Sequence, residues 1–149
     1  DYPQSAELEA ELARINIPLI KVSAQIETEI SELDPEDAKD FMDSLGLKDS
    51  GIARIARTVY SHLGLISFFT AGEREVHAWT IRKNDTASIA AGKIHSDIER
   101  GFIRAEVVSY EDLVTHGTMQ NVKEKGLFRL EGREYIVQDG DVITFRFNV

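Results

Sequence analysis

The sequence predicts an α+β protein in two parts, a helical and α/β segment over residues 1–63 and a sheet-forming domain over residues 64–149. Three observations favour this organisation. Apolar residues recur at helical spacing as far as about residue 63, and from Leu65 onward they alternate as in strands. The helix-start signal Asp34-Pro35 stands in the first part, whereas glycine-rich turn signals interrupt the second. Strands, one helix and further strands, in that order, are typical of a sheet with a helix on one face.

In the first part, residues 4–14 are expected to form a helix. The apolar run at residues 17–22 predicts a strand buried on both faces. The chain offers this strand no obvious parallel partner. We therefore expect residues 1–32 to be poorly ordered or paired with another copy, as in a strand-swapped dimer. Two further helices are expected, one that Asp34 caps and one over about residues 50–63.

The second part begins with two strand-like runs whose connection, residues 71–74, is typical of a hairpin. The expected strands cover residues 65–70, 76–82, 102–110, 127–130, 135–137 and 142–149. Thr86 is expected to cap a helix that runs to residue 95, and residues 110–126 are expected to be helical and irregular. Alternation along the strands places Ile103, Ala105 and Val107 toward the core. The same alternation places Arg82, Arg104 and Arg146 on exposed faces.

Composition and charge limit the function. The 149 residues include no cysteine, which excludes disulfides and thiolate metal sites and suits the cytoplasm, our expected location. No apolar run approaches the roughly 20 residues that span a bilayer. The net charge of −9 is uneven, because the first part holds 13 acids and 6 bases and the second 13 acids and 11 bases. The acidic first part should not bind nucleic acid, whereas the second part can if its bases cluster.

The runs LGLISFFTAGEREVHAWTI, AAGKIHSDIERGFIRAEVVSY and LEGREYIVQDGDVITFRFNV closely resemble the C-terminus of the YchF-type, Obg-related P-loop NTPases. The terminal part is similar to a TGS domain, a β-grasp (ubiquitin-like) module, with residues 91–97 and 138–141 as its most typical stretches. The resemblance implies a parent protein with a nucleotide-binding G domain, a helical insertion and this module. The resemblance also implies that this parent protein associates with the ribosome, through the large subunit or RNA, and hydrolyses ATP or GTP with Mg²⁺.

The sequence departs from that family in one large respect. The phosphate-cradling run Gly-x-x-x-x-Gly-Lys-Ser/Thr does not occur. The first residue is Asp1, not Met. We therefore expect a C-terminal fragment with no catalytic centre or cofactor of its own. One piece of the nucleotide site is implied to remain, since Ser23-Ala24-Gln25 resembles the family's Ser-Ala-Lys base loop with Gln25 in place of lysine. In that reading the Ala24 N–H faces the purine; the alternative is a mere strand-to-helix turn.

A set of basic residues is the candidate for contact with RNA phosphates or an acidic protein surface, because arginine forks suit phosphate geometry. Its members are Arg82, Lys83, Lys93, Arg100, Arg104 and Arg146. The alternative is a group of solvated arginines paired with Glu106 and its neighbours. Three functions follow: a ribosome- or RNA-docking module, part of an NTP-hydrolysing enzyme, or a protein-interaction adaptor that uses its sheet face. No metal site is expected, because His95 and Asp97 do not share a helix face and residues 139–141 suit a turn better than a calcium loop.

Overall fold

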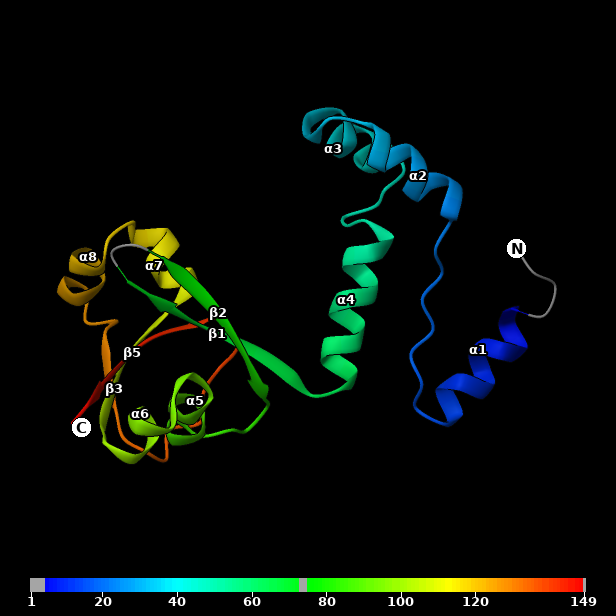
Figure 1. Ribbon diagram of the computed structural model, residues 1–149. Coiled ribbons are helices and arrows are strands. Elements are labelled where there is room, and N and C mark those ends of the chain that lie inside the picture. The colour runs from blue at the N-terminus through cyan, green and yellow to red at the C-terminus, as the bar shows by residue number, and fades with distance from the viewer. Residues whose placement is uncertain (1–4, 73–74, 149) are drawn as a thin grey trace. The chain divides into compact units, whose positions relative to one another are not determined.

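The structure is a computed structural model that describes residues 5–72 and 75–148, and the chain forms two compact units, Asp1–Leu63 and Gly64–Val149. The first unit contains four helices among its described residues (Figure 1). They are α1 (Ser5–Arg14), α2 (Ala24–Glu32), α3 (Pro35–Ser44) and α4 (Gly51–His62). The expected helix start at Asp34 is confirmed, since its carboxylate accepts hydrogen bonds from Glu36 N and Asp37 N at 3.1 and 3.0 Å. These bonds satisfy two N–H groups that the helix itself leaves unpaired.

The strand predicted for residues 17–22 is wrong. These residues form an extended segment between α1 and α2 that belongs to no sheet. Ile17, Leu19 and Val22 are each more than 40% exposed. A strand needs a second strand to satisfy its backbone groups, and the described residues of this unit provide only helices. At one point a side chain satisfies a backbone group that a neighbouring strand would otherwise pair with, since the Arg54 guanidinium donates a hydrogen bond to the Lys21 carbonyl.

The first unit has almost no core of its own. Among its described residues only Gly51 is buried. The amphipathic helix α4 leaves large apolar side chains exposed at helical spacing, with Ile52 at 73% and Val59 at 46%. Exposed apolar faces of this size normally pack against other protein.

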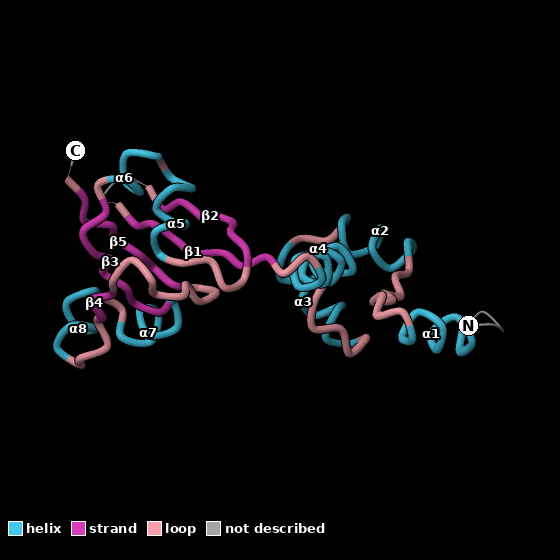
Figure 2. The backbone as a smooth tube through the Cα atoms, turned by 90° about the horizontal axis from the view of Figure 1, so that it is seen from below, coloured by secondary structure: helices cyan, strands magenta, loops and turns pink. Residues whose placement is uncertain are grey.

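The second unit is built on a five-stranded mixed sheet in the order β2-β1-β5-β3-β4, in which only the central β1–β5 pair is parallel (Figures 1 and 2). The strands are β1 (Leu65–Ala71), β2 (Val76–Arg82), β3 (Phe102–Ser109), β4 (Arg129–Glu131) and β5 (Asp141–Phe147). The helices are α5 (Ala87–Ile94), α6 (Ser96–Arg100), α7 (Tyr110–His116) and α8 (Met119–Glu124). The expected cap of α5 is confirmed, since Thr86 Oγ1 accepts from Ile89 N. Of the expected hairpin turn, Glu73 and Arg74 lie outside the described residues.

The two faces of this sheet are covered by different helices. Helices α5 and α6 lie on one face and α7 and α8 on the other (Figure 2). Under α5 lies the main core, whose centre is formed by Phe68, Ala105, Val107, Ile143 and Phe145. We call the opposite side the outer face.

One inward prediction failed because of a β-bulge. The pairing of β3 with β5 shifts between Phe102, which lies opposite Phe147, and Arg104, which lies opposite Arg146. Two residues of β3 therefore face one of β5, and the alternation changes phase at that point. As a result Ile103 is 56% exposed and Phe102 packs against the core in its place. Beyond the bulge the predicted alternation is confirmed.

Candidate functional sites

Two arginines that the sequence placed on exposed faces lie side by side on the outer face of the sheet. Arg104 of β3 and Arg146 of β5 are cross-strand partners. Arg146 donates from Nε and Nη2 to the two carboxylate oxygens of Glu106 at 2.8 and 3.0 Å. Arg104 Nη2 lies 3.7 Å from Glu106 Oε1. The two arginine side chains are 52% and 56% exposed, whereas that of Glu106 is only 12% exposed, so one sheltered carboxylate holds two solvent-facing guanidinium groups.

The charge balance of this group is positive. The hydrogen bonds from Arg146 lower the pKa of Glu106, and the charges of Arg146, Arg104 and Lys123 lower it further against the opposing effect of burial. Lys123, from α8, makes the smallest of these contributions, and its Nζ lies 4.7 Å from the Phe128 ring centre. We call Arg104, Arg146, Lys123 and Glu106 the outer-face cluster. Two arginines contact the one acid in it, and Lys123 adds a weaker charge effect.

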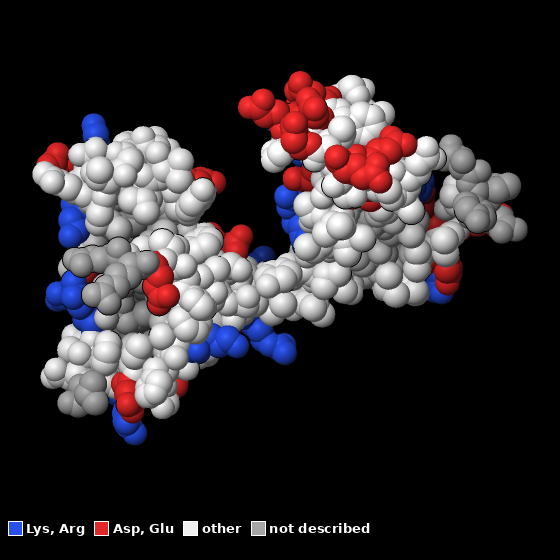
Figure 3. Space-filling view, turned by 45° about the horizontal axis from the view of Figure 1, so that its top comes forward, with Lys and Arg blue, Asp and Glu red and all other residues white. Residues whose placement is uncertain are grey.

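The remaining predicted basic residues lie elsewhere. Arg82 lies opposite Leu65 at the start of β1, whereas Arg146 lies four residues beyond Val142, the partner of Phe69. Eight residue steps along the strands separate them, roughly 26 Å at about 3.3 Å per residue. The Lys83 N–H donates to Gly64 O at 2.7 Å, and the Arg100 guanidinium pairs with Asp97. Figure 3 agrees with this dispersal, since blue side chains occupy several separate places on the surface of this unit.

A hollow of about 520 Å³ lies between the end of β2 and α5. Both Arg82 and Lys93 line it, together with the acids Asp85 and Glu99. The Arg82 N–H donates to Asp85 Oδ2 at 2.9 Å. Charges of both signs therefore meet here, in contrast to the outer-face cluster.

The Ser23-Ala24-Gln25 stretch forms the start of α2. Ser23 Oγ accepts from Ile26 N at 3.4 Å, and Gln25 Nε2 donates to Glu29 Oε1 at 3.0 Å. Ala24 is the first helical residue, so its N–H is one of those for which the helix offers no acceptor. An open hollow of about 430 Å³ adjoins this loop. It is lined by Lys21, Val22, Ser23, Ile26, Glu27, Leu47 and Arg54.

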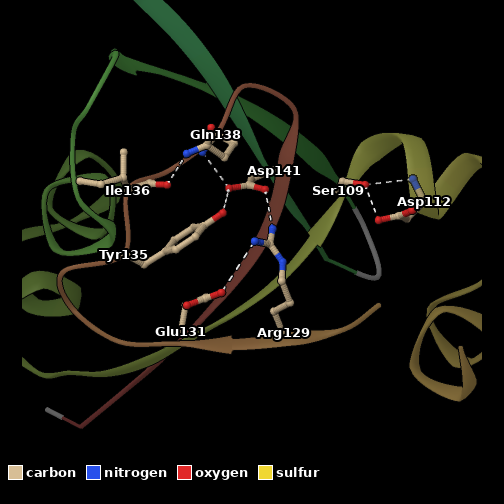
Figure 4. Close-up of polar contacts among 8 residues, drawn as sticks. All are labelled: Ser109, Asp112, Arg129, Glu131, Tyr135, Ile136, Gln138 and Asp141. Carbon is tan, nitrogen blue, oxygen red and sulfur yellow. Dashed lines mark hydrogen bonds and ion pairs between the residues drawn. The ribbon is translucent and has the colours of Figure 1, made fainter. Parts of the chain in front are cut away.

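The acidic residues of the two units differ in role. Acids gather over α2 and α3 on the surface of the first unit (Figure 3). In the second unit Asp141 is only 2% exposed and accepts from Tyr135 Oη, Gln138 N and Arg129 Nη2 at 2.8, 2.9 and 3.2 Å (Figure 4). Its neighbour Asp139 accepts from Ser67 N at 2.8 Å. Residues 139–141 thus form the expected turn and fasten the start of β5 to β1.

His95 also has a local role, since its Nδ1 accepts from Asp97 N at 3.1 Å at the start of α6. No group of three or more metal-binding side chains converges in residues 5–72 and 75–148. No helix within those ranges is long and apolar enough to cross a membrane.

The fold and these sites define a mixed α/β unit with a cationic outer face, joined in sequence to a helical segment with little core. The family model YchF-GTPase_C, described as a protein of unknown function (DUF933), matches residues 65–148. The chain belongs to the YchF family.

Named relatives agree with this assignment. The ribosome-binding ATPase YchF of Bacillus subtilis is 56% identical over 134 residues, which cover 90% of this chain and 37% of that protein. Its counterpart in Escherichia coli O157:H7 is 50% identical over 131 residues, 88% of this chain and 36% of that protein. The YchF GTPase of Schizosaccharomyces pombe matches 96% of this chain and 38% of its own with a TM-score of 0.81 and 32% identity. This chain thus spans little more than a third of the relatives that it matches.

Proposed function

We propose that this chain is the ribosome-docking part of a YchF-type nucleotide hydrolase, with residues 64–149 as a TGS module of the β-grasp type. The bacterial relatives are named ribosome-binding ATPases, and this observation carries the proposal. The sheet order β2-β1-β5-β3-β4 with a parallel central pair, and a helix packed across one face, support the β-grasp assignment. Fold alone does not determine function, and the family and the surface of the chain indicate the partner.

Residues 1–63 are, in this proposal, the remainder of the nucleotide-binding G domain. Their exposed apolar residues, and a glycine as the one buried residue among positions 5–63, suit a segment that packs against more protein. The Ser23-Ala24-Gln25 loop supplies one helix-start N–H to a purine, with a net contribution of roughly 0.5–1.5 kcal/mol per hydrogen bond. That is too little to hold a nucleotide without a phosphate cradle. ATP or GTP with Mg²⁺ therefore binds only in a protein that contains the P-loop. The proposed location of this protein is the cytoplasm.

Co-sedimentation of the 149-residue chain with purified ribosomes tests the docking role. The chain is expected to pellet with ribosomes and with isolated large subunits in low salt, and to hydrolyse neither ATP nor GTP above background. Failure to pellet would refute the docking role, and magnesium-dependent turnover would refute the assignment of the enzymatic part.

A protein-interaction adaptor that uses the sheet face is the alternative. The exposed part of the outer face, where Thr144 and Leu130 lie opposite Glu106 on the neighbouring strands, is the observation in its favour. Pull-down with and without ribonuclease separates the two, because association through the ribosome depends on intact RNA.

A further inference from the structure

We infer that Arg104, Arg146 and Lys123 form a docking site for the phosphodiester backbone of RNA, in which Glu106 is a positioning residue. This inference rests on the proposed ribosome-docking function and adds to it the partner and the contact residues. Lys123 was absent from the candidates that the sequence provided, and two of the cations become a pair only through the register of β3 and β5.

The geometry of the cluster suits a phosphate. Arg104 and Arg146 start from paired positions on neighbouring strands, which lie about 5 Å apart in a sheet. The bidentate contact with Glu106 uses Nε and Nη2 of Arg146, which leaves its third nitrogen, Nη1, outside that contact. Guanidinium donors that are already fixed lose less conformational entropy when they bind a phosphate oxygen.

The charges favour nucleic acid over a neutral partner. Glu106 neutralises only one of the three cations, and its lowered pKa keeps it ionised at neutral pH. The rest of this unit is weakly acidic and the first unit strongly so. The other basic residues of this unit are dispersed, so contacts with a polyanion should be few and centred on the cluster, of the kind that position a protein on a nucleic-acid backbone without reading its sequence.

Binding of the 149-residue chain to ribosomes and to protein-free ribosomal RNA, measured over a salt series, tests the inference. The double variant R104Q/R146Q is expected to bind both about tenfold more weakly at 0.15 M salt, with the salt slope reduced by about 2. The matched control is R82Q/K83Q, which removes the same charge at the distant end of the sheet and is expected to leave both affinities unchanged. K123Q leaves the Arg146–Glu106 contact intact and is expected to lower the slope by about 1.

E106Q separates positioning from charge. If Glu106 orients the arginines, E106Q weakens binding although the chain loses a negative charge; tighter binding would overturn the positioning role.

The remaining outcomes are distinct from one another. If R104Q/R146Q and K123Q bind ribosomes like the unmodified chain, the inferred site is wrong and the docking function stands. If they lose ribosome binding while the unmodified chain does not bind protein-free RNA, the cluster contacts a ribosomal protein and the RNA inference is wrong. If the unmodified chain binds no ribosome, the proposed function itself fails, and the inference with it.

Discussion

The buried carboxylate of Asp141 accepts a hydrogen bond from the phenol of Tyr135 at 2.8 Å (Figure 4). The same carboxylate accepts from Gln138 N and from the Arg129 guanidinium. Asp141, at the start of β5, thereby connects this strand to Arg129 of β4 and to Tyr135 and Gln138 in the segment between β4 and β5. Because Asp141 is almost fully buried, the Tyr135 phenol and the Gln138 N–H would lose their acceptor without it, whereas Arg129 also lies 3.7 Å from Glu131.

Replacing Asp141 should be costly for stability. D141N keeps the shape but loses the charge and places an amide N–H₂ among donors, so we expect a loss of about 2–4 kcal/mol in unfolding free energy. Urea denaturation measures the difference. The control E131Q removes a carboxylate that lies 3.7 Å from Arg129 in a more exposed pair, and should cost less than about 1 kcal/mol. Equal effects of the two variants would contradict the role assigned to Asp141.

The tyrosine in this network should titrate late. Burial first, and then the hydrogen bond to Asp141 and its negative charge, raise the pKa of Tyr135 to about 12, against about 10 in an unfolded chain. The folded state therefore holds this proton more tightly, so the stabilisation is complete below about pH 10 and is lost as the pH rises through about 12. Absorbance at alkaline pH should show one late tyrosinate, absent in Y135F. If the tyrosinate absorbance change near pH 12 were unchanged in Y135F, it would belong to another tyrosine.

Two glycines of the second unit should differ sharply in their tolerance of alanine. A Cβ on Gly101 would lie 1.8 Å from Asn148 O, a backbone atom that cannot move without displacing the end of β5, whereas a Cβ on Gly132 meets nothing within 4 Å. Overpacking of this kind costs about 1–3 kcal/mol or more, so G101A should lower the unfolding free energy and G132A should leave it within about 1 kcal/mol. Thermal unfolding of both variants checks this, and a G101A protein as stable as G132A would contradict the close approach.

The sequence predicted most of the second unit because its signals are local. Thr86 caps a helix, and the alternation along β5 identifies its buried face. The exposure of Ile103 could not be predicted, because a β-bulge depends on how two strands pair and neither strand's sequence indicates it. Lys123 was missed because a cluster on a sheet face is assembled by register and by α8, across positions that are remote in sequence.

The first unit was harder to predict for a different reason. An apolar run such as residues 17–22 indicates a need for burial, and whether a strand forms depends on a neighbouring strand that the described residues do not supply. The buried role of Asp141 was likewise hidden, since a turn sequence gives no sign of which acid faces the core.

In the first unit, the start of α4 should depend on a side chain from α2. Glu27 Oε1 accepts from Gly51 N at 2.7 Å, and an N-terminal helix N–H of this kind has no acceptor within its own helix. E27A should therefore destabilise the start of α4 by about 1 kcal/mol and speed hydrogen exchange of the Gly51 amide by about fivefold. The control E29A removes a carboxylate that contacts only Gln25 on the same helix surface among the bonds described, and should leave that amide unchanged. Equal exchange in E27A and in the unmodified chain would mean that Ser50, whose Oγ accepts from Ala53 N at 3.2 Å, starts α4 without help from α2.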